Sequence, residues 1–202
     1  ILGFATYRLF VRISLDGLEA THNRLRDNPR SFARALETLR RLKQLAGRYP
    51  RLSVQVQTSV GTHNLQELDG MSAFVVRELG LFQAFEFIRD VGMTAGGGWL
   101  SAWYGPPEKA TLLTPRDMRA AMEKVSRIYG NHLGEGVFNR YQAEFQMRLL
   151  ELSHQQVSAG RPAIGCTSGD SFACIFPNLD VAVCEMTRRI GNLAEFDYDL
   201  PR

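Results

Sequence analysis

The chain has 202 residues and a mass of 22.7 kDa, enough for one sizeable domain or a domain with a small appendage. It is 45% hydrophobic and 22% charged, like an ordinary soluble globular protein, and a net charge of +3 is too small to imply a nucleic-acid partner. No apolar run reaches roughly 18 residues and nothing resembles a secretory signal, so we expect a cytoplasmic protein without a membrane partner. Because Ile1 is not a methionine, we expect the chain to begin inside a longer protein.

The first predicted element is a buried strand over Phe10 to Leu15, an apolar and partly β-branched run. Asp16-Gly17 breaks the run, because glycine tolerates backbone angles that other residues resist. In α/β proteins ligands bind at the carboxyl ends of parallel strands, where Ser14 and Asp16 would lie. A polar segment with His22 and several arginines follows, and it suits a polar metabolite. The arginines are more often a solvated helix face than an anion site: Arg24, Arg26, Arg30 and Arg34.

The next four elements alternate between helix and strand. We expect a helix over Ser31 to Leu45 with Ser31 as its N-cap, and a strand over Arg51 to Gly61. A second helix over Asn64 to Leu79, capped by Asn64, leads to a strand over Leu81 to Val91. This order predicts an α/β fold with parallel strands, either half of a barrel or part of a doubly wound sheet.

Residues 92 to 113 are predicted to form a loop, because three consecutive glycines and a pair of prolines interrupt the pattern. We favour a mobile lid or a substrate-side loop over a phosphate loop, since no Lys-Ser/Thr follows the glycines. Thr114 and Pro115 then begin a helix that runs to about Tyr129.

A linker over Gly130 to Gly136 and a long helix over Val137 to Ser158 complete this part of the chain. An aromatic stripe on the long helix is expected to be core packing: Phe138, Tyr141 and Phe145. His132 and His154 are expected to be structural or surface residues.

The three cysteines all lie in the last fifth of the chain, at Cys166, Cys174 and Cys184. This placement favours a metal or cluster site over a disulfide framework, although three core cysteines are the simpler alternative. Short strands over Ser171 to Phe176 and Asp180 to Val183 predict a hairpin that can bring Cys166 and Cys184 together. Cys174 would face away from Cys184. Because a closed site needs four ligands, an iron–sulfur cluster, zinc and a plain hairpin all stay open.

Two groups of motifs resemble radical SAM enzymes. Ile13-Ser-Leu-Asp-Gly17 followed by His22 and Leu25-Arg26 is similar to their fourth-strand segment, with Asn23 in place of the usual Asp and Asp27 in place of Gly. Three later stretches resemble the opening of the SPASM or twitch domain that follows such barrels: Cys166-Thr-Ser-Gly169, Phe176-Pro-Asn-Leu-Asp-Val-Ala-Val-Cys184-Glu and Ile190-Gly-Asn-Leu193. Ser168, Leu179 and Val183 replace the usual Ala, Gly and Pro. Since leucine disfavours a positive φ, we expect the turn at Leu179 to differ from that of the family.

The resemblance implies the C-terminal half of a partial (β/α)6 radical SAM barrel, strands four to six, over residues 1–91. A loop and helical connector would occupy residues 92–160, and the start of a cysteine-bearing β-hairpin domain of the SPASM or twitch type residues 161–202. The C-x3-C-x2-C loop that binds the catalytic [4Fe–4S] cluster does not occur in this chain. The fragment alone is therefore expected to be inactive.

The implied parent is an enzyme that abstracts hydrogen from an unidentified substrate, a small molecule or a peptide, through a 5′-deoxyadenosyl radical. It would receive electrons from a donor such as flavodoxin or ferredoxin. Ser14 would hydrogen-bond the ribose or methionine part of S-adenosylmethionine, Arg26 would pair with its carboxylate and Phe85 would lie near its adenine. Asp16, counted with these cofactor-binding residues, would organise the turn, with His22 behind it.

Cys166 and Cys184 would bind an auxiliary cluster, which is incomplete in this chain. The alternative is a non-catalytic binding or scaffold protein with a zinc or structural cysteine hairpin.

Overall fold

The computed structural model describes residues 9–88, 111–132, 137–165, 170, 173–176, 178–184 and 189–197. The chain forms two compact units. The first comprises Ile1–Ile88 and Leu113–Arg161, and the second comprises Arg89–Leu112 and Pro162–Arg202. The helices expected in a connector therefore belong to the same unit as the first three strands. Most of the loop predicted over residues 92–113, with its three glycines, lies outside the described residues.

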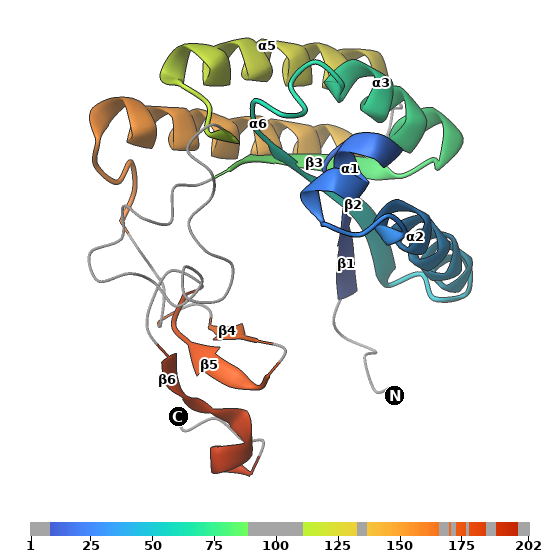
Figure 1. Cartoon of the computed structure of the whole chain (residues 1–202), viewed down its shortest axis with the longest axis vertical. Coiled ribbons are helices and arrows are strands. Elements are labelled where there is room, and N and C mark those ends of the chain that lie inside the picture. Colours follow the sequence, from blue (N-terminus) through green and yellow to red (C-terminus); the bar gives the residue numbers. More distant parts are fainter. Residues whose placement is uncertain are drawn as a thin grey trace. The chain divides into compact units, whose positions relative to one another are not determined.

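A three-stranded parallel sheet forms the centre of the first unit. Its strands are β1 (Leu9–Ser14), β2 (Leu52–Val60) and β3 (Phe82–Phe87), in the order β1-β2-β3 (Figure 1). The predicted α/β class and the alternation of strand and helix are confirmed. Within the described residues, no strand pairs with the outer edge of β1. The half-barrel stays a prediction.

One face of this sheet is apolar, because successive residues of a strand point to opposite faces. Val54 and Val56 of β2 pack there with residues of helix α2 (Ser31–Arg48) and of helix α3 (Leu68–Ala73). A π-helical turn, η1 (Phe74–Glu78), continues α3. The apolar residues of α2 recur at helical spacing. They thus cover the apolar positions of β2, which alternate with polar ones.

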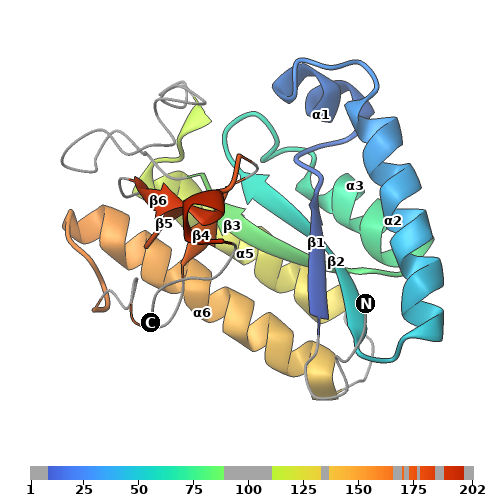
Figure 2. The same ribbon diagram turned by 90° about the horizontal axis from the view of Figure 1, so that it is seen from below.

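Two further helices, α5 (Pro115–His132) and α6 (Val137–Ala159), lie beside β3 (Figure 2). They share a second core cluster with the carboxyl ends of β2 and β3, whose main members are Val60, Phe85, Phe87, Met118, Val125, Ile128, Tyr129 and Leu150. The predicted N-cap of α5 is confirmed, because Thr114 Oγ1 accepts a hydrogen bond from the Asp117 N–H at 3.2 Å. The linker predicted to begin at Gly130 starts later, since α5 extends to His132.

Two predicted helix caps are wrong. Ser31 is the first residue of α2, and the Phe32 N–H donates instead to Asn23 Oδ1 at 2.8 Å. Asn64 does not begin a helix, because residues 62–67 form turns and α3 starts only at Leu68. At α2 a side chain from the preceding loop thus takes the role predicted for Ser31, whereas α3 begins without a side-chain cap.

Two predictions of burial are also wrong. Strand β1 is largely exposed, with Leu9 and Phe10 among the exposed apolar side chains, because nothing described covers its outer edge. The stripe on α6 is not core either, since Tyr141 is 65% and Phe145 50% exposed. Their rings stack with centroids 6.4 Å apart. The side chain of Phe138 lies outside the described residues, and so does that of His132; His154 is buried, in keeping with a structural role.

The second unit contains an antiparallel sheet of three short strands: β4 (Cys174–Ile175), β5 (Asp180–Ala182) and β6 (Arg189–Asn192). The predicted hairpin is confirmed. Asp180 ties the sheet together: Asn178 Nδ2 and Asn192 Nδ2 donate to its carboxylate at 2.6 and 3.0 Å, and Arg189 Nε lies 2.9 Å from it. The hydrogen bond from Asn192 is the main cause that lowers the pKa of this carboxyl group.

Leu179, in the turn before β5, has a φ of 68°, in the left-handed region that favours glycine. The expectation that this turn must differ from one with a glycine is therefore wrong. The Leu179 N–H donates to the Phe176 carbonyl at 2.8 Å, and the Leu193 N–H donates to the Leu179 carbonyl at 2.7 Å. These two bonds hold a leucine in a backbone conformation that leucine rarely adopts.

The cysteines of this unit are only partly described. Cys166 lies outside the described residues, whereas Cys174 lies in β4 and Cys184 follows β5. Cys174 pairs with Ala182, and directly paired residues of an antiparallel ladder share a face. Cys184 lies in a bend beyond the end of β5, where the alternation of strand side chains no longer applies. That Cys174 faces away from Cys184 stays a prediction.

Candidate functional site

Polar residues gather where β1 and β2 end, in the loops that precede helix α1 (Glu19–Leu25) and helix α3. Ser14 is the last residue of β1, and Ser59 is the second-last residue of β2. Both lie at the carboxyl edge of a parallel sheet, which is the usual place for a ligand in α/β proteins. The candidate site consists of these strand ends, the β1–α1 loop and the β2–α3 loop.

Asp16 is the centre of the hydrogen bonding at this edge. One carboxylate oxygen accepts from the Ser59 N–H at 3.1 Å and the other from Arg26. Its own N–H donates to His22 Nδ1 at 3.1 Å, and its carbonyl accepts from Asn64 Nδ2 at 2.8 Å. Because every polar group of Asp16 is engaged, this residue fixes both loops to the strand ends. The prediction that Asp16 organises the turn agrees with this placement.

Arg26 is held by Asp16 but stays open to solvent. Its Nη2 forms an ion pair with the buried Asp16 carboxylate, while the arginine side chain is 45% exposed. A guanidinium has five N–H donors in a planar fork, and only Nη2 is engaged within the described part of the chain. Arg26 therefore keeps donors that can bind an anionic group such as a carboxylate.

His22 is buried behind this pair and its protonation state follows from its contacts. The Asp16 N–H can only donate, so Nδ1 must be the acceptor, and the proton therefore sits on Nε2, 3.1 Å from Ser31 Oγ. Burial is the main cause that lowers the pKa of His22; the charge of Asp16 opposes this and that of Arg26 adds to it. A neutral His22 positions the Asp16 backbone and does not face a ligand itself.

The two loops are also clamped by Glu67, which follows the β2 strand end. Its carboxylate accepts from the Leu18 N–H at 3.0 Å and from Thr21 Oγ1 at 2.5 Å, at the beginning of α1. Gly17 leaves the space for this clamp, because a Cβ there would lie 2.6 Å from Thr21 Cγ2 and 3.1 Å from Glu67 Oε2. The φ of Gly17 is not in the left-handed region. Its predicted conformational role is wrong, since close packing is what requires glycine here.

Asn64 completes the frame. Its Nδ2 donates to the carbonyls of Asp16 and Ser59 at 2.8 and 2.9 Å, and its Oδ1 accepts from the Gly61 N–H at 3.0 Å. The buried Asn64 side chain thus replaces backbone partners that the loop cannot supply. Without this residue two carbonyls at the strand ends would lose a donor.

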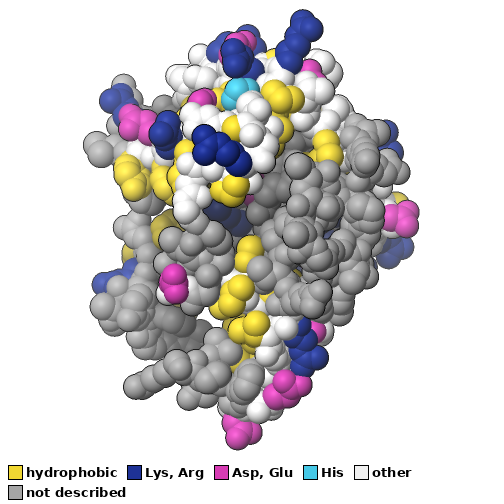
Figure 3. Space-filling model, turned by 90° about the vertical axis from the view of Figure 1, so that its left-hand side faces the viewer, with side chains coloured by type: hydrophobic (Ala, Val, Ile, Leu, Met, Phe, Trp, Pro, Cys, Tyr) yellow, Lys and Arg dark blue, Asp and Glu magenta, His cyan; other side chains and the backbone are white. Residues whose placement is uncertain are grey.

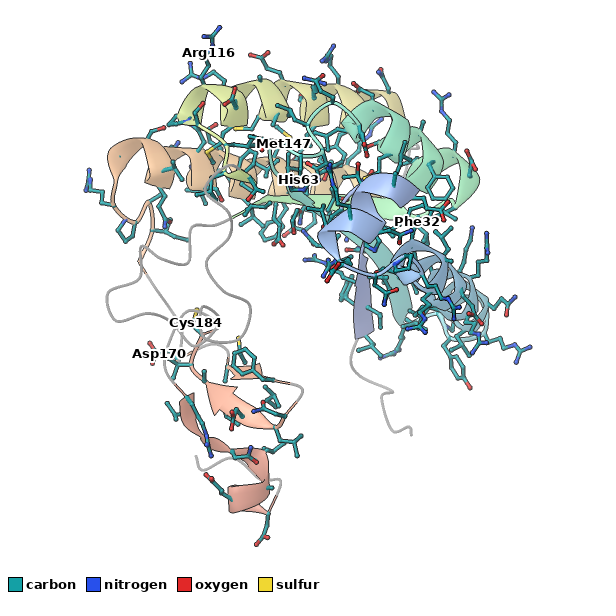
Figure 4. All side chains as sticks on the ribbon, viewed as in Figure 1. Phe32, His63, Arg116, Met147, Asp170 and Cys184 are labelled. Carbon is teal, nitrogen blue, oxygen red and sulfur yellow. The ribbon has the colours of Figure 1, made fainter. Side chains whose placement is uncertain are left out.

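His63 could not be selected from the sequence, because it belongs to no motif. It lies between β2 and α3 (Figure 4), and both of its ring nitrogens are buried without a hydrogen-bond partner in the described part of the chain. Burial is the main cause that lowers its pKa; the carboxylates of Asp16 and Glu67 raise it and Arg24 lowers it. A single loop histidine has no periodic pattern, and two of its charged neighbours, Asp16 and Arg24, come from the β1–α1 loop and from α1.

Ser14 and Phe85 are placed very differently. The Ser14 side chain is exposed at the end of β1, and register puts it on the same face as Gln57 of β2. Phe85 is 1% exposed and lies in the core, edge-on to Tyr129 with ring centroids 5.8 Å apart. Ser14 can reach a ligand at the strand ends. A contact of Phe85 with an adenine ring stays a prediction, and this packing does not favour it.

The sheet face that carries Ser14 is mostly polar. Arg12 Nε donates to Gln55 Oε1 at 3.2 Å and Arg12 Nη1 to Gln57 Oε1 at 3.4 Å. On the same face, between β2 and β3, Ser59 Oγ donates to Glu86 Oε1 at 3.1 Å. A hydrogen-bonded polar face on a parallel sheet is unlike the apolar packing of the opposite face. It suits the wall of a site for a polar small molecule.

Metal ligands are not assembled in the described part of the chain, where no group of three or more His, Cys, Asp or Glu side chains could hold an ion. No helix among the described residues is long and apolar enough to cross a membrane. On the face drawn in Figure 3, lysine and arginine side chains alternate with acidic and apolar ones instead of forming one continuous patch.

The fold and this site define the chain as a mixed α/β protein with a polar site at the carboxyl ends of parallel strands. Comparison with known proteins adds no family: no family model, no curated protein and no solved structure matches the chain.

Proposed function

We propose that this chain is a fragment of a radical SAM enzyme: the C-terminal half of its partial barrel, followed by the start of a SPASM- or twitch-type cysteine hairpin domain. The observation that carries the proposal is that the buried Asp16 carboxylate holds Arg26. Asp16 comes only two residues after the exposed Ser14, at the end of β1. The resemblance assigns Ser14, Asp16 and Arg26 together to S-adenosylmethionine. These residues fit that molecule, because a hydroxyl and an open guanidinium suit its ribose hydroxyls and its carboxylate.

The open edge of β1 supports the half-barrel. A parallel strand normally has neighbours on both sides and is buried, whereas β1 leaves Leu9 and Phe10 exposed. A further parallel strand along that edge would cover them. The resemblance requires such a strand, since the three described strands correspond to the last three of six.

Leu179 supports the hairpin assignment. The SPASM or twitch pattern has glycine at this position, five residues before Cys184, and leucine here adopts a φ of 68°. The turn thus keeps a backbone conformation that favours glycine although the residue is leucine. This indicates that the hairpin requires that turn geometry. Cys166 and Cys184 would be ligands of an auxiliary cluster, with the remaining ligands outside this chain.

The chemistry of the enzyme would come from the bound groups: an iron–sulfur cluster, with its catalytic ligands outside this chain, would supply the electron for reductive cleavage of S-adenosylmethionine. This chain's residues would have another task. Asp16 fixes Arg26, Arg26 binds the carboxylate and Ser14 orients the ribose or methionine part. The substrate, a small molecule or a peptide, and an electron donor such as flavodoxin or ferredoxin belong to the same proposal.

Metal analysis of the full-length protein, purified without oxygen, tests this proposal. We expect iron and acid-labile sulfide, together with a C-x3-C-x2-C motif in the reading frame before Ile1. Zinc alone, or no metal, in a protein without that motif would contradict the proposal. It would support a binding or scaffold protein with a zinc or structural hairpin.

A further inference from the structure

The buried ring nitrogens of His63 distinguish this residue from the other polar groups of the site. In native proteins almost all buried polar atoms have a hydrogen-bond partner, so an unpartnered atom requires an explanation. Two other side chains of the described chain share this property, Ser72 and Gln83, but both are fully enclosed in the packed interior. His63 instead lies in a loop at the strand ends, and part of its side chain is exposed although both ring nitrogens are buried.

The nearest carboxylates bond to other residues and not to His63. The Asp16 carboxylate already accepts from Ser59 and Arg26, and the Glu67 carboxylate already accepts from Leu18 and Thr21. The neighbouring Asn64 has its amide bound to three backbone groups, which fixes the loop on the C-terminal side of His63. The loop that carries the imidazole is thus held in place by bonds that Asn64 makes, and a fixed loop is a form of preorganisation found in binding sites.

The ring chemistry indicates what it would bind. Burial lowers the pKa of His63, so the ring is neutral near neutral pH. A neutral imidazole offers one N–H donor and one nitrogen acceptor. A hydroxyl or a carboxamide can both donate and accept, whereas a carboxylate could use only the donor.

We infer that His63 is a binding residue of the strand-end site and that its ligand presents a hydroxyl or carboxamide group to the imidazole. Two molecules could carry this group: S-adenosylmethionine, through its ribose hydroxyls, or the substrate. The first source rests on the proposed function. The inference about His63 itself rests on the two buried nitrogens at the strand ends.

Two measurements on three variants test this inference. His63→Leu removes both nitrogens and His63→Gln retains a donor and an acceptor. His22→Leu is the matched control, because both nitrogens of His22 are already bonded within the protein. The first measurement is the thermal midpoint without ligand, and the second is the affinity of the full-length protein for S-adenosylmethionine.

We expect His63→Leu to raise the midpoint by about 2–4 °C, because it removes two unpaired buried atoms, and His22→Leu to lower it. If His63→Leu also weakens S-adenosylmethionine binding about tenfold while His63→Gln stays within about threefold, that molecule is the ligand. A raised midpoint with unchanged affinity supports the inference and assigns the group to the substrate.

A lowered midpoint in His63→Leu would overturn the inference, because it would show that the protein or a bound water already satisfies the ring. Failure of the wild-type protein to bind S-adenosylmethionine would contradict the proposed function instead. In that case the thermal midpoint alone would test the inference about His63.

Discussion

Asp16 and Arg26 form an ion pair between a buried carboxylate and a half-exposed guanidinium at the carboxyl end of β1. The other Asp16 oxygen accepts from the Ser59 N–H, so the same carboxylate joins β2 to the β1–α1 loop. An ion pair that is anchored on one side differs from a surface pair, because the buried partner cannot move into water when the contact is lost. The pair therefore has a structural role, and under the proposed function it would also hold Arg26 ready for a ligand.

Asp16→Ala should lower the free energy of unfolding by about 3 kcal/mol, because Ser59 and Arg26 both lose their acceptor in a buried place. Chemical denaturation of the wild-type protein and the variant measures this difference. Glu37→Ala is the control, since Glu37 forms an exposed pair with Arg41 on α2 and its loss should cost less than about 0.5 kcal/mol. Equal losses in the two variants would show that Asp16 is not an anchor.

Gly17→Ala should lower the free energy of unfolding by about 1–3 kcal/mol, because the new methyl group would overlap with Thr21 and displace the Glu67 clamp. Gly70→Ala in α3 should raise it by about 0.5–1 kcal/mol, since nothing lies within 4 Å of a Cβ there. We expect urea unfolding to give a lower free energy of unfolding for Gly17→Ala and a higher one for Gly70→Ala than for the wild-type protein. A neutral or stabilising Gly17→Ala would mean that the β1–α1 loop moves without cost.

His22 should make the protein less stable in mild acid. Its pKa in the folded state is lowered by burial, so the unfolded chain takes up a proton first as the pH falls below about 6.5. The contribution to stability is complete above that pH and is lost as the pH falls through the lowered pKa. Unfolding at about pH 7.5 and about pH 5.5 should therefore show a larger loss in the wild-type protein than in His22→Gln.

The lowered pKa of His63 acts in the same direction, so His22→Gln should keep part of the pH dependence. A His22→Gln/His63→Gln variant should lose more of it. An unchanged pH dependence in the double variant would show that neither histidine is neutral through burial.

Leu179→Gly should raise the stability of the second unit by about 1 kcal/mol, because glycine adopts a φ of 68° without the penalty that a side chain imposes. Gly160→Ala is the converse control: Gly160 has a φ of 62° and open space around it, so alanine should cost about 1 kcal/mol through backbone strain alone. Thermal unfolding of both variants measures the two effects. A destabilised Leu179→Gly would mean that packing of the leucine side chain outweighs its strain.

The strands and most helices could be predicted because their signals are local. The alternation in β2 and the Thr-Pro start of α5 each depend on a few consecutive residues. The helix start at Asn64 could not be predicted in this way. Its side chain resembles an N-cap in sequence, but its partner is the Asp16 carbonyl, which lies in another loop.

The site was predictable only in part for the same reason. Ser14, Asp16 and Arg26 follow a recognisable strand and lie within one short segment. His63 becomes visible only when the β1–α1 and β2–α3 loops meet, because its importance comes from missing partners and not from a motif. The exposure of β1 likewise depends on what pairs with its edge, which the apolar run itself does not reveal.

Calorimetric titration of S-adenosylmethionine into the full-length protein, prepared without oxygen, would show whether the protein binds this molecule through Arg26. We expect the wild-type protein to bind, Arg26→Ala to bind about tenfold more weakly or worse, and Arg41→Ala to bind like the wild type. Arg41 is the matched control because it is an exposed arginine paired with a carboxylate outside the site. Absence of binding to the wild-type protein, or equal affinity of Arg26→Ala and Arg41→Ala, would contradict the account.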